Sequence, residues 1–94
     1  MIKTKRKVDK NLLAKVKDFP CCVCGRGPSD PHHIKTKKSG GPDEVWNLTP
    51  LCRQHHTEIH AIGLTSFANK HEAFIKALTS RGWVYDEARG KWGR

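Results

Sequence analysis

Apolar residues at helical spacing predict helices in separate stretches of the chain. The first helix lies within residues 9–18 and is ended by Pro20; its apolar face is made by Leu12, Leu13 and Val16. Residues 52–62, CRQHHTEIHAI, have the composition of a second helix, which closes at Gly63. A third helix is expected to be capped by Ser66 and to run to about Arg81. We interpret its apolar face as core; this face comprises Phe67, His71, Phe74, Ile75 and Leu78.

The remaining pattern favours short strands. HHI at 32–34 is short enough to be a strand end, and VWNLTPL at 45–51 is prone to form a strand up to Pro50. Between them, KTKKSGGPDE is polar and without period, which predicts a loop. The tail at 83–94 alternates like a two-stranded hairpin, and its aromatic residues Trp83, Tyr85 and Trp92 are available to pack on the core. The pattern as a whole predicts an α+β domain.

Length and composition limit the class of protein. A chain of 94 residues is expected to form one domain, and such a domain buries only about 60–65% of its unfolded surface, so a staple would add needed stability. No apolar run approaches the ~20 residues of a membrane span, and the basic start lacks the apolar run of a secretory leader. We therefore expect no membrane partner and a cytoplasmic, intracellular protein, in a compartment where cysteines hold metal rather than form disulfides.

The charge balance favours a polyanionic partner. Lys and Arg total 18 against 9 for Asp and Glu, a net charge of +9, and nucleic acid is the simplest partner for that excess. A merely basic surface is the alternative. The first seven residues carry much of this charge and are expected to form a mobile basic arm; they include Lys3, Lys5, Arg6 and Lys7.

Cysteine spacing predicts a structural zinc site. Cys21 and Cys24 form C-x2-C followed by a glycine, and Cys52 and His55 repeat the spacing as C-x2-H. Three sulfurs and one nitrogen complete a tetrahedral Zn2+ site with no open position. The fourth cysteine, Cys22, is too close to Cys24 for the usual knuckle, and we interpret it as a plain thiol.

The other histidines predict a second constellation. His56 and His60 are one helical turn apart on one face, near enough to chelate one ion. His32 and His33 are adjacent on an extended segment and point to opposite sides, so one can complete a metal site while the other faces substrate or water. The simpler interpretations are that His60 lies on the helix surface and that His32 only supports the site.

These residues carry a family resemblance. DPHHI, then NLTPLC, then HH with a further histidine four residues on resembles the HNH, or ββα-metal, endonuclease family in its zinc-stapled form. The loop KSGGPDEVWNLTPLCRQHH is similar to small phage-type enzymes, including recombination-enhancement nucleases. The resemblance covers about residues 20–71. It implies a zinc-stapled ββα core at 19–63. Together with the sequence pattern, this predicts a basic arm and short helix at 1–18, and a C-terminal helix and hairpin packing on the core at 64–94.

The resemblance also implies residue roles. His33 matches the general base, and Asn47 matches the central asparagine that orients the base or its loop. The catalytic metal would be held by His32, His56 and His60, with His32 standing where the family often has Asp. Three imidazoles suit Mn2+, Ni2+, Co2+ or Zn2+ better than Mg2+. His71 is left outside the site.

The function implied is metal-dependent cleavage of DNA to 5′-phosphate and 3′-hydroxyl ends, as nicks or double-strand breaks. Lysines of the loop are expected to contact phosphates with little sequence specificity, although such a run is ordinarily solvated; these are Lys35, Lys37 and Lys38. The enzyme would be a monomer or weak dimer, of phage or prophage type. The alternatives are a zinc-containing nucleic-acid-binding module without catalysis and a zinc-stabilised module that docks a protein.

Overall fold

The computed structural model describes residues 6–94, and this part of the chain contains four α-helices and two two-stranded sheets. The α+β class predicted from the sequence is confirmed. Lys3 and Lys5 of the expected arm lie outside the described residues. Among residues 6–94, no helix combines the length and the apolar character that crossing a membrane requires.

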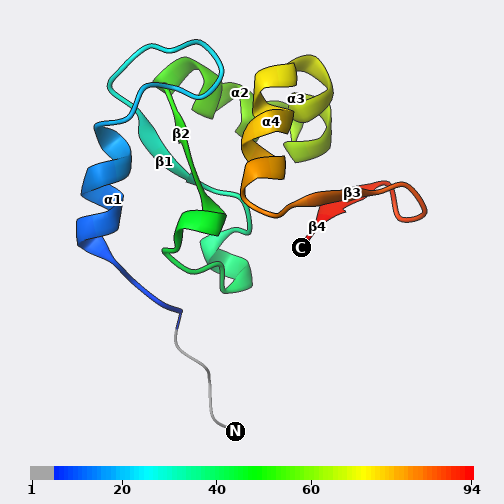
Figure 1. Cartoon of the computed structure of the whole chain (residues 1–94), viewed down its shortest axis with the longest axis horizontal. Helices are drawn as coiled ribbons and strands as arrows, with labels where there is room; N and C mark the ends of the chain where they lie inside the picture. The colour runs from blue at the N-terminus through cyan, green and yellow to red at the C-terminus, as the bar shows by residue number, and fades with distance from the viewer. Residues whose placement is uncertain (1–5) are drawn as a thin grey trace, which may run out of the picture.

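A hairpin followed by a helix forms the centre of the molecule (Figure 1). Strands β1 (Asp30–His33) and β2 (Leu48–Leu51) pair antiparallel, with His32 opposite Thr49 and His33 opposite Leu48. Helix α2 (Arg53–Ile62) begins directly after Cys52 and ends at Gly63, as expected. Residues 45–47, expected to extend the strand, instead form a 3-10 turn, η2 (Val45–Asn47). A second such turn, η1 (Lys37–Ser39), lies in the predicted loop.

Helix α1 (Lys10–Lys17) confirms the first helical pattern. Asp9 caps it, because its Oδ1 accepts a hydrogen bond of 3.0 Å from the backbone N–H of Leu12. The residues before it differ from the expected mobile arm. Arg6 Nη1 lies 2.6 Å from Asp43 Oδ1, and Lys7 Nζ lies 3.0 Å from Glu44 Oε1, so both residues are held against the loop before η2.

The prediction of a single C-terminal helix that begins at Ser66 is wrong. The chain forms α3 (Leu64–Lys70) and α4 (Glu72–Ser80), separated by His71, whose backbone is extended at φ −123° and ψ 98°. Ser66 lies inside α3. The break allows the His71 ring to reach Glu58 of α2 at 2.6 Å while apolar side chains on both sides stay in the core. The helical spacing of apolar residues continues through His71, so the sequence pattern did not reveal that its backbone is extended.

The core joins the helices to the hairpin. Phe67 and Phe74 are fully buried and meet edge to face with their ring centroids 4.9 Å apart. Leu51 and Leu78 belong to the same cluster. The cluster also contains Cys21 and Cys52, so the cysteine site adjoins the core.

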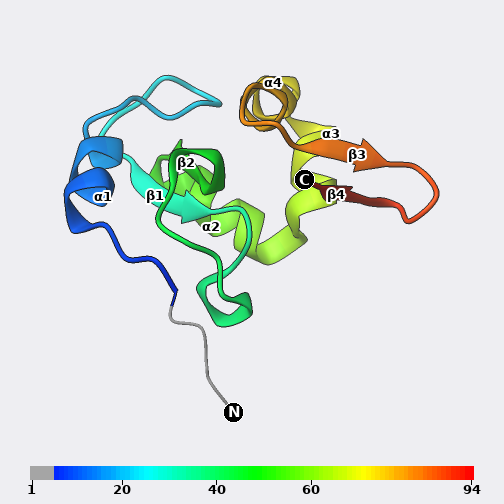
Figure 2. The ribbon, with the colours of Figure 1, turned by 60° about the horizontal axis from the view of Figure 1, so that its bottom comes forward.

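The tail forms the expected hairpin from β3 (Val84–Asp86) and β4 (Lys91–Gly93), which extends away from the rest of the molecule (Figure 2). Trp83 is buried and Trp92 packs partly against the core, whereas Tyr85 is exposed. The prediction of aromatic packing therefore holds for the two tryptophans.

Candidate metal centres and the adjoining cleft

The four predicted zinc ligands meet where α2 begins. Cys21 and Cys24 come from the turn before β1, whereas Cys52 and His55 come from the first turn of α2. Their donor atoms all lie within 4.8 Å of one another. They therefore lie close enough together to bind a metal ion such as zinc.

The separations fit a tetrahedral ion. The Cys24 and Cys52 sulfurs are 3.7 Å apart, and Zn–S bonds of ~2.3 Å place two sulfurs of a tetrahedron about 3.8 Å apart. His55 Nδ1 lies 3.2 Å from Cys52 Sγ and 3.6 Å from Cys21 Sγ, against about 3.5 Å for a mixed S–N edge. The donor set and its spacing are those of a structural zinc site.

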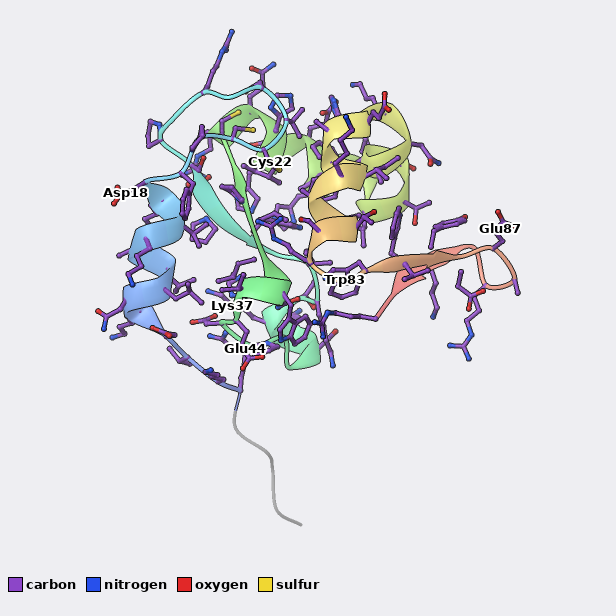
Figure 3. All side chains as sticks on the ribbon, in the orientation of Figure 1. Asp18, Cys22, Lys37, Glu44, Trp83 and Glu87 are labelled. Atoms are coloured by element: carbon purple, nitrogen blue, oxygen red, sulfur yellow. The ribbon has the colours of Figure 1, made fainter. Side chains whose placement is uncertain are left out.

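The local backbone supports thiolate chemistry. Gly25, at φ 76°, allows the tight turn, and its N–H donates to the Cys21 carbonyl at 2.9 Å. Burial acts to raise the pKa of Cys21, but N–H groups of Cys52, Cys24 and Val23 lower it to about 6. Burial instead raises the pKa of Cys22 to about 11. Cys22 lies within this turn, at the end of the hairpin where α2 begins (Figure 3), but it is not among the four grouped donors.

The structure also brings His32, His56 and His60 together. One ring nitrogen from each lies within 4.8 Å of the others, and the Nε2 atoms of His56 and His60 are 3.0 Å apart. His32 is buried on the hairpin, whereas His60 is exposed. Burial, together with the neighbouring His56 and His60, lowers the pKa of His32 to about 3. Its imidazole therefore stays neutral and keeps a lone pair that can bind a metal ion. Metal binding at this second cluster stays a prediction.

Asp30 is a functional candidate that the sequence interpretation missed. Its Oδ2 lies 3.1 Å from His56 Nδ1 and 3.4 Å from Arg53 Nε. A carboxylate bonded to Nδ1 keeps the proton there and leaves Nε2 free to bind an ion. The available signal was its spacing, since Asp30 and His32 are two residues apart on one strand and share a face.

His33 does not belong to that cluster and contacts a different carboxylate. Its Nε2 lies 2.7 Å from Oδ1 of Asp43, a fully buried carboxylate. Asp43 was not singled out from the sequence, because it sits in an irregular loop ten residues away and no periodicity links it to His33. Its contacts depend on tertiary structure alone.

Asn47 holds the loop between the strands. It is fully buried, its Oδ1 accepts from the Lys35 N–H at 2.7 Å, and its Nδ2 donates to the carbonyls of Lys35 and Pro42 at 3.0 Å each. All three of these hydrogen bonds close residues 35–42 into one compact loop. The orienting role that the resemblance implies for Asn47 stays a prediction.

A cleft of about 400 Å³ brings the cluster of His32, His56 and His60 together with His33. Its lining includes all the predicted catalytic histidines and two of the three predicted lysines. Lys35 is not among the lining residues. Its backbone N–H donates to Asn47, and its side chain is exposed. The lining residues are Pro31, His32, His33, Thr36, Lys37, Lys38, His56 and His60.

A third cluster adjoins the cysteine site and shares His55 with it. His71 Nε2 and Glu58 Oε1 are 2.6 Å apart, Lys70 also pairs with Glu58, and donor atoms of His55, Glu58 and His71 lie within 4.8 Å of one another. His71, left outside the site in the sequence interpretation, therefore sits next to a predicted zinc ligand.

Comparisons with known proteins place the chain in a family. Residues 1–80 match the model described as "Protein of unknown function (DUF968)". The chain is also similar to the "Uncharacterized protein YdfU" of Escherichia coli (strain K12), with 38% identity over 79 residues, which is 81% of this chain and 22% of that protein. The chain thus spans about a fifth of the length of that relative. No solved structure matches. Because the family model covers most of the chain, including all the metal-ligand candidates, the chain belongs to the DUF968 family.

Proposed function

We propose that this domain is a metal-dependent HNH-type endonuclease acting on DNA. The observation that carries the proposal is the single cleft that holds three clustered imidazoles, a separate carboxylate-bound histidine and two lysines. A structural zinc site alone needs none of these. The order β1, β2, α2 supports assigning residues 19–63 to a ββα-metal unit with a zinc staple at its base.

In this proposal His32, His56 and His60 hold one divalent ion, from the set Mn2+, Mg2+, Ni2+, Co2+ or Zn2+. Bound there, the ion would supply charge stabilisation for the phosphate oxygens of the transition state. The Asp30 carboxylate orients His56 for that role, because it occupies the Nδ1 side of the ring.

His33 is the proposed general base. It takes a proton from a water molecule whose oxygen forms the new bond to phosphorus, while the bond from phosphorus to the 3′ oxygen breaks. The 3′ oxygen then gains a proton from solvent, which leaves 5′-phosphate and 3′-hydroxyl ends. Asn47 acts indirectly by fixing the loop that lines the cleft.

The lysines of η1 are the proposed phosphate-binding residues. Lys37 and Lys38 line the cleft beside His33, and Lys37 lies towards the opposite end of the hairpin from Cys22 (Figure 3). The net charge of +9 provides attraction along a DNA backbone without reading bases.

Plasmid nicking tests the proposal. Wild-type chain should nick supercoiled DNA with Mn2+ or Mg2+ and lose activity in EDTA. His33→Gln should lower kcat at least ~100-fold, because Gln can still donate to Asp43 but cannot accept the proton. Zinc content and DNA affinity should be unchanged. Wild-type rates in His33→Gln would exclude His33 as the base.

The lysine contacts have a matched control. Lys37→Ala with Lys38→Ala should lower the salt dependence of DNA binding, the slope of log Kd against log salt, by about 1.8, since each phosphate contact contributes about 0.9. Lys15→Ala with Lys17→Ala removes the same charge from α1, whose lysines are not among the cleft-lining residues, and should change the slope less. Equal changes in both variants would mean that only net charge matters.

The alternative function is a zinc-containing module that binds nucleic acid without cutting it. The basic charge and the cysteine site favour it equally. Tight DNA binding by the wild-type chain, with no nicking under any of the five metals, would establish this alternative over the nuclease.

A further inference from the structure

Asp43 is a buried carboxylate to which three hydrogen-bond donors are directed. Its side chain is 0% exposed. Oδ1 accepts from Arg6 Nη1 at 2.6 Å and faces His33 Nε2 at 2.7 Å, while Oδ2 accepts from the Asp9 N–H at 2.9 Å. Both oxygens are therefore engaged by separate parts of the chain.

The carboxylate stays ionised in this setting. Burial acts to raise the pKa of Asp43, but the hydrogen bonds from His33, the Asp9 N–H and Arg6 outweigh it and lower the pKa to about 2. An ionised carboxylate can only accept hydrogen bonds. The ring nitrogen of His33 that faces it must therefore carry a proton.

We infer that Asp43 is a positioning residue that holds the uncharged form of His33 in the tautomer protonated on Nε2, with Nδ1 left as the proton acceptor. This inference rests on the proposed function only in assigning Nδ1 as the atom that takes the proton from water. The tautomer itself is a property of the folded chain. A neutral imidazole has one donor and one acceptor nitrogen, and a bound carboxylate decides which is which.

The other contacts of Asp43 make it the fixed partner of the pair. Arg6 and the Asp9 N–H orient the carboxylate independently of His33, and the Asp43 N–H donates to the Lys7 carbonyl at 2.8 Å. The segment before α1 thus reaches the site through Asp43. Loss of the contacts between this segment and Asp43 would leave the carboxylate that holds His33 less well fixed, without changing a residue that lines the cleft.

The test compares two adjacent carboxylates. Asp43→Asn keeps the shape of the side chain but removes the negative charge that favours a proton on Nε2 of His33, whichever way the amide turns. Glu44→Gln makes the same change next door, where the side chain is partly exposed and pairs with Lys7. Arg6→Met removes the N-terminal ion pair but leaves the contact between Asp43 and His33.

The readout is a long-range 1H–15N correlation spectrum of the zinc-loaded chain, which distinguishes protonated from unprotonated ring nitrogens. His33 is assigned among the six histidines by the signal that His33→Gln removes. Wild-type, Glu44→Gln and Arg6→Met should show His33 protonated on Nε2, and Asp43→Asn should show population of the Nδ1–H form. A wild-type His33 protonated on Nδ1, or an unchanged tautomer in folded Asp43→Asn, overturns the inference. If Asp43→Asn does not fold, the wild-type spectrum still decides.

Nicking kinetics separate this inference from the proposed function. Asp43→Asn should lower kcat by ~10²–10⁴-fold with unchanged DNA affinity, as expected when the base is in the wrong tautomer, whereas Glu44→Gln should cut normally. Full kcat in Asp43→Asn would overturn the positioning role and leave the nuclease intact. If the wild-type chain does not nick at all, the nuclease proposal fails, and the tautomer spectrum alone supports or overturns the role of Asp43.

Discussion

Zinc should control the thermal stability of this domain, and a single ligand replacement should remove that control. The change is Cys52→Ala, which deletes one of four donors that link the turn at 21–24 to the start of α2. Cys52 is only 7% exposed and belongs to the core cluster, so metal binding and core formation are coupled. Cys22→Ala is the matched control, because it removes a neighbouring thiol outside the donor set.

The size of the effect follows from mass action. A structural zinc site that contributes roughly 10 kcal/mol has an apparent Kd on the order of 0.1 µM. At ~10 µM free zinc the native state is then stabilised by about 2.7 kcal/mol. For a domain of this size that corresponds to a rise in Tm of roughly 10–20 °C. Each further tenfold in free zinc adds about 1.4 kcal/mol.

The assay is thermal unfolding followed by circular dichroism in a zinc-buffered series. Wild-type and Cys22→Ala should show Tm rising with the logarithm of free zinc, and Cys52→Ala should show a lower Tm without that dependence. A wild-type Tm that does not change between ~0.1 and ~10 µM free zinc would refute the staple, because native-state binding must shift the unfolding equilibrium.

Three further changes, with one control substitution, test the packing around the cleft and core by urea unfolding. Phe74→Ala should cost about 3–5 kcal/mol, since a fully buried ring is lost from the core; a loss below about 1 kcal/mol would contradict the packing. Asn47→Ala should cost roughly 2–4 kcal/mol, because three backbone groups lose the hydrogen bonds of a fully buried amide. Gly41→Ala should cost about 3 kcal/mol, because the added Cβ would overlap the Lys35 carbonyl. Gly93→Ala meets no atom within 4 Å and should be nearly neutral; equal losses at the two glycines would contradict this reasoning.

Much of the site was predictable because its ligands are local in sequence. The C-x2-C and C-x2-H pairs each sit within one turn of chain, and His56 and His60 are one helical turn apart, so short-range geometry places each pair whatever surrounds it. The α1 cap at Asp9 and the end of α2 at Gly63 also follow from local signals. The alternation of His32 and His33 follows from the period of a strand.

The break at His71 was not predictable, since periodicity along 66–81 favours one helix. The break accompanies the contact of His71 with Glu58, thirteen residues earlier. The held position of Arg6 likewise depends on Asp43, which is 37 residues away. Local patterns contain no information about such partners.

By itself, the sequence determined the α+β class, the helix and strand segments around the site, and which cysteines and histidines can form pairs, because these depend on spacing within a turn or a strand. Only the tertiary structure decided that Asp30 and Asp43 serve different histidines, and that η1 brings two lysines to the same cleft. The physical reason is that these contacts join segments far apart in the chain, and their geometry exists only once the core has packed.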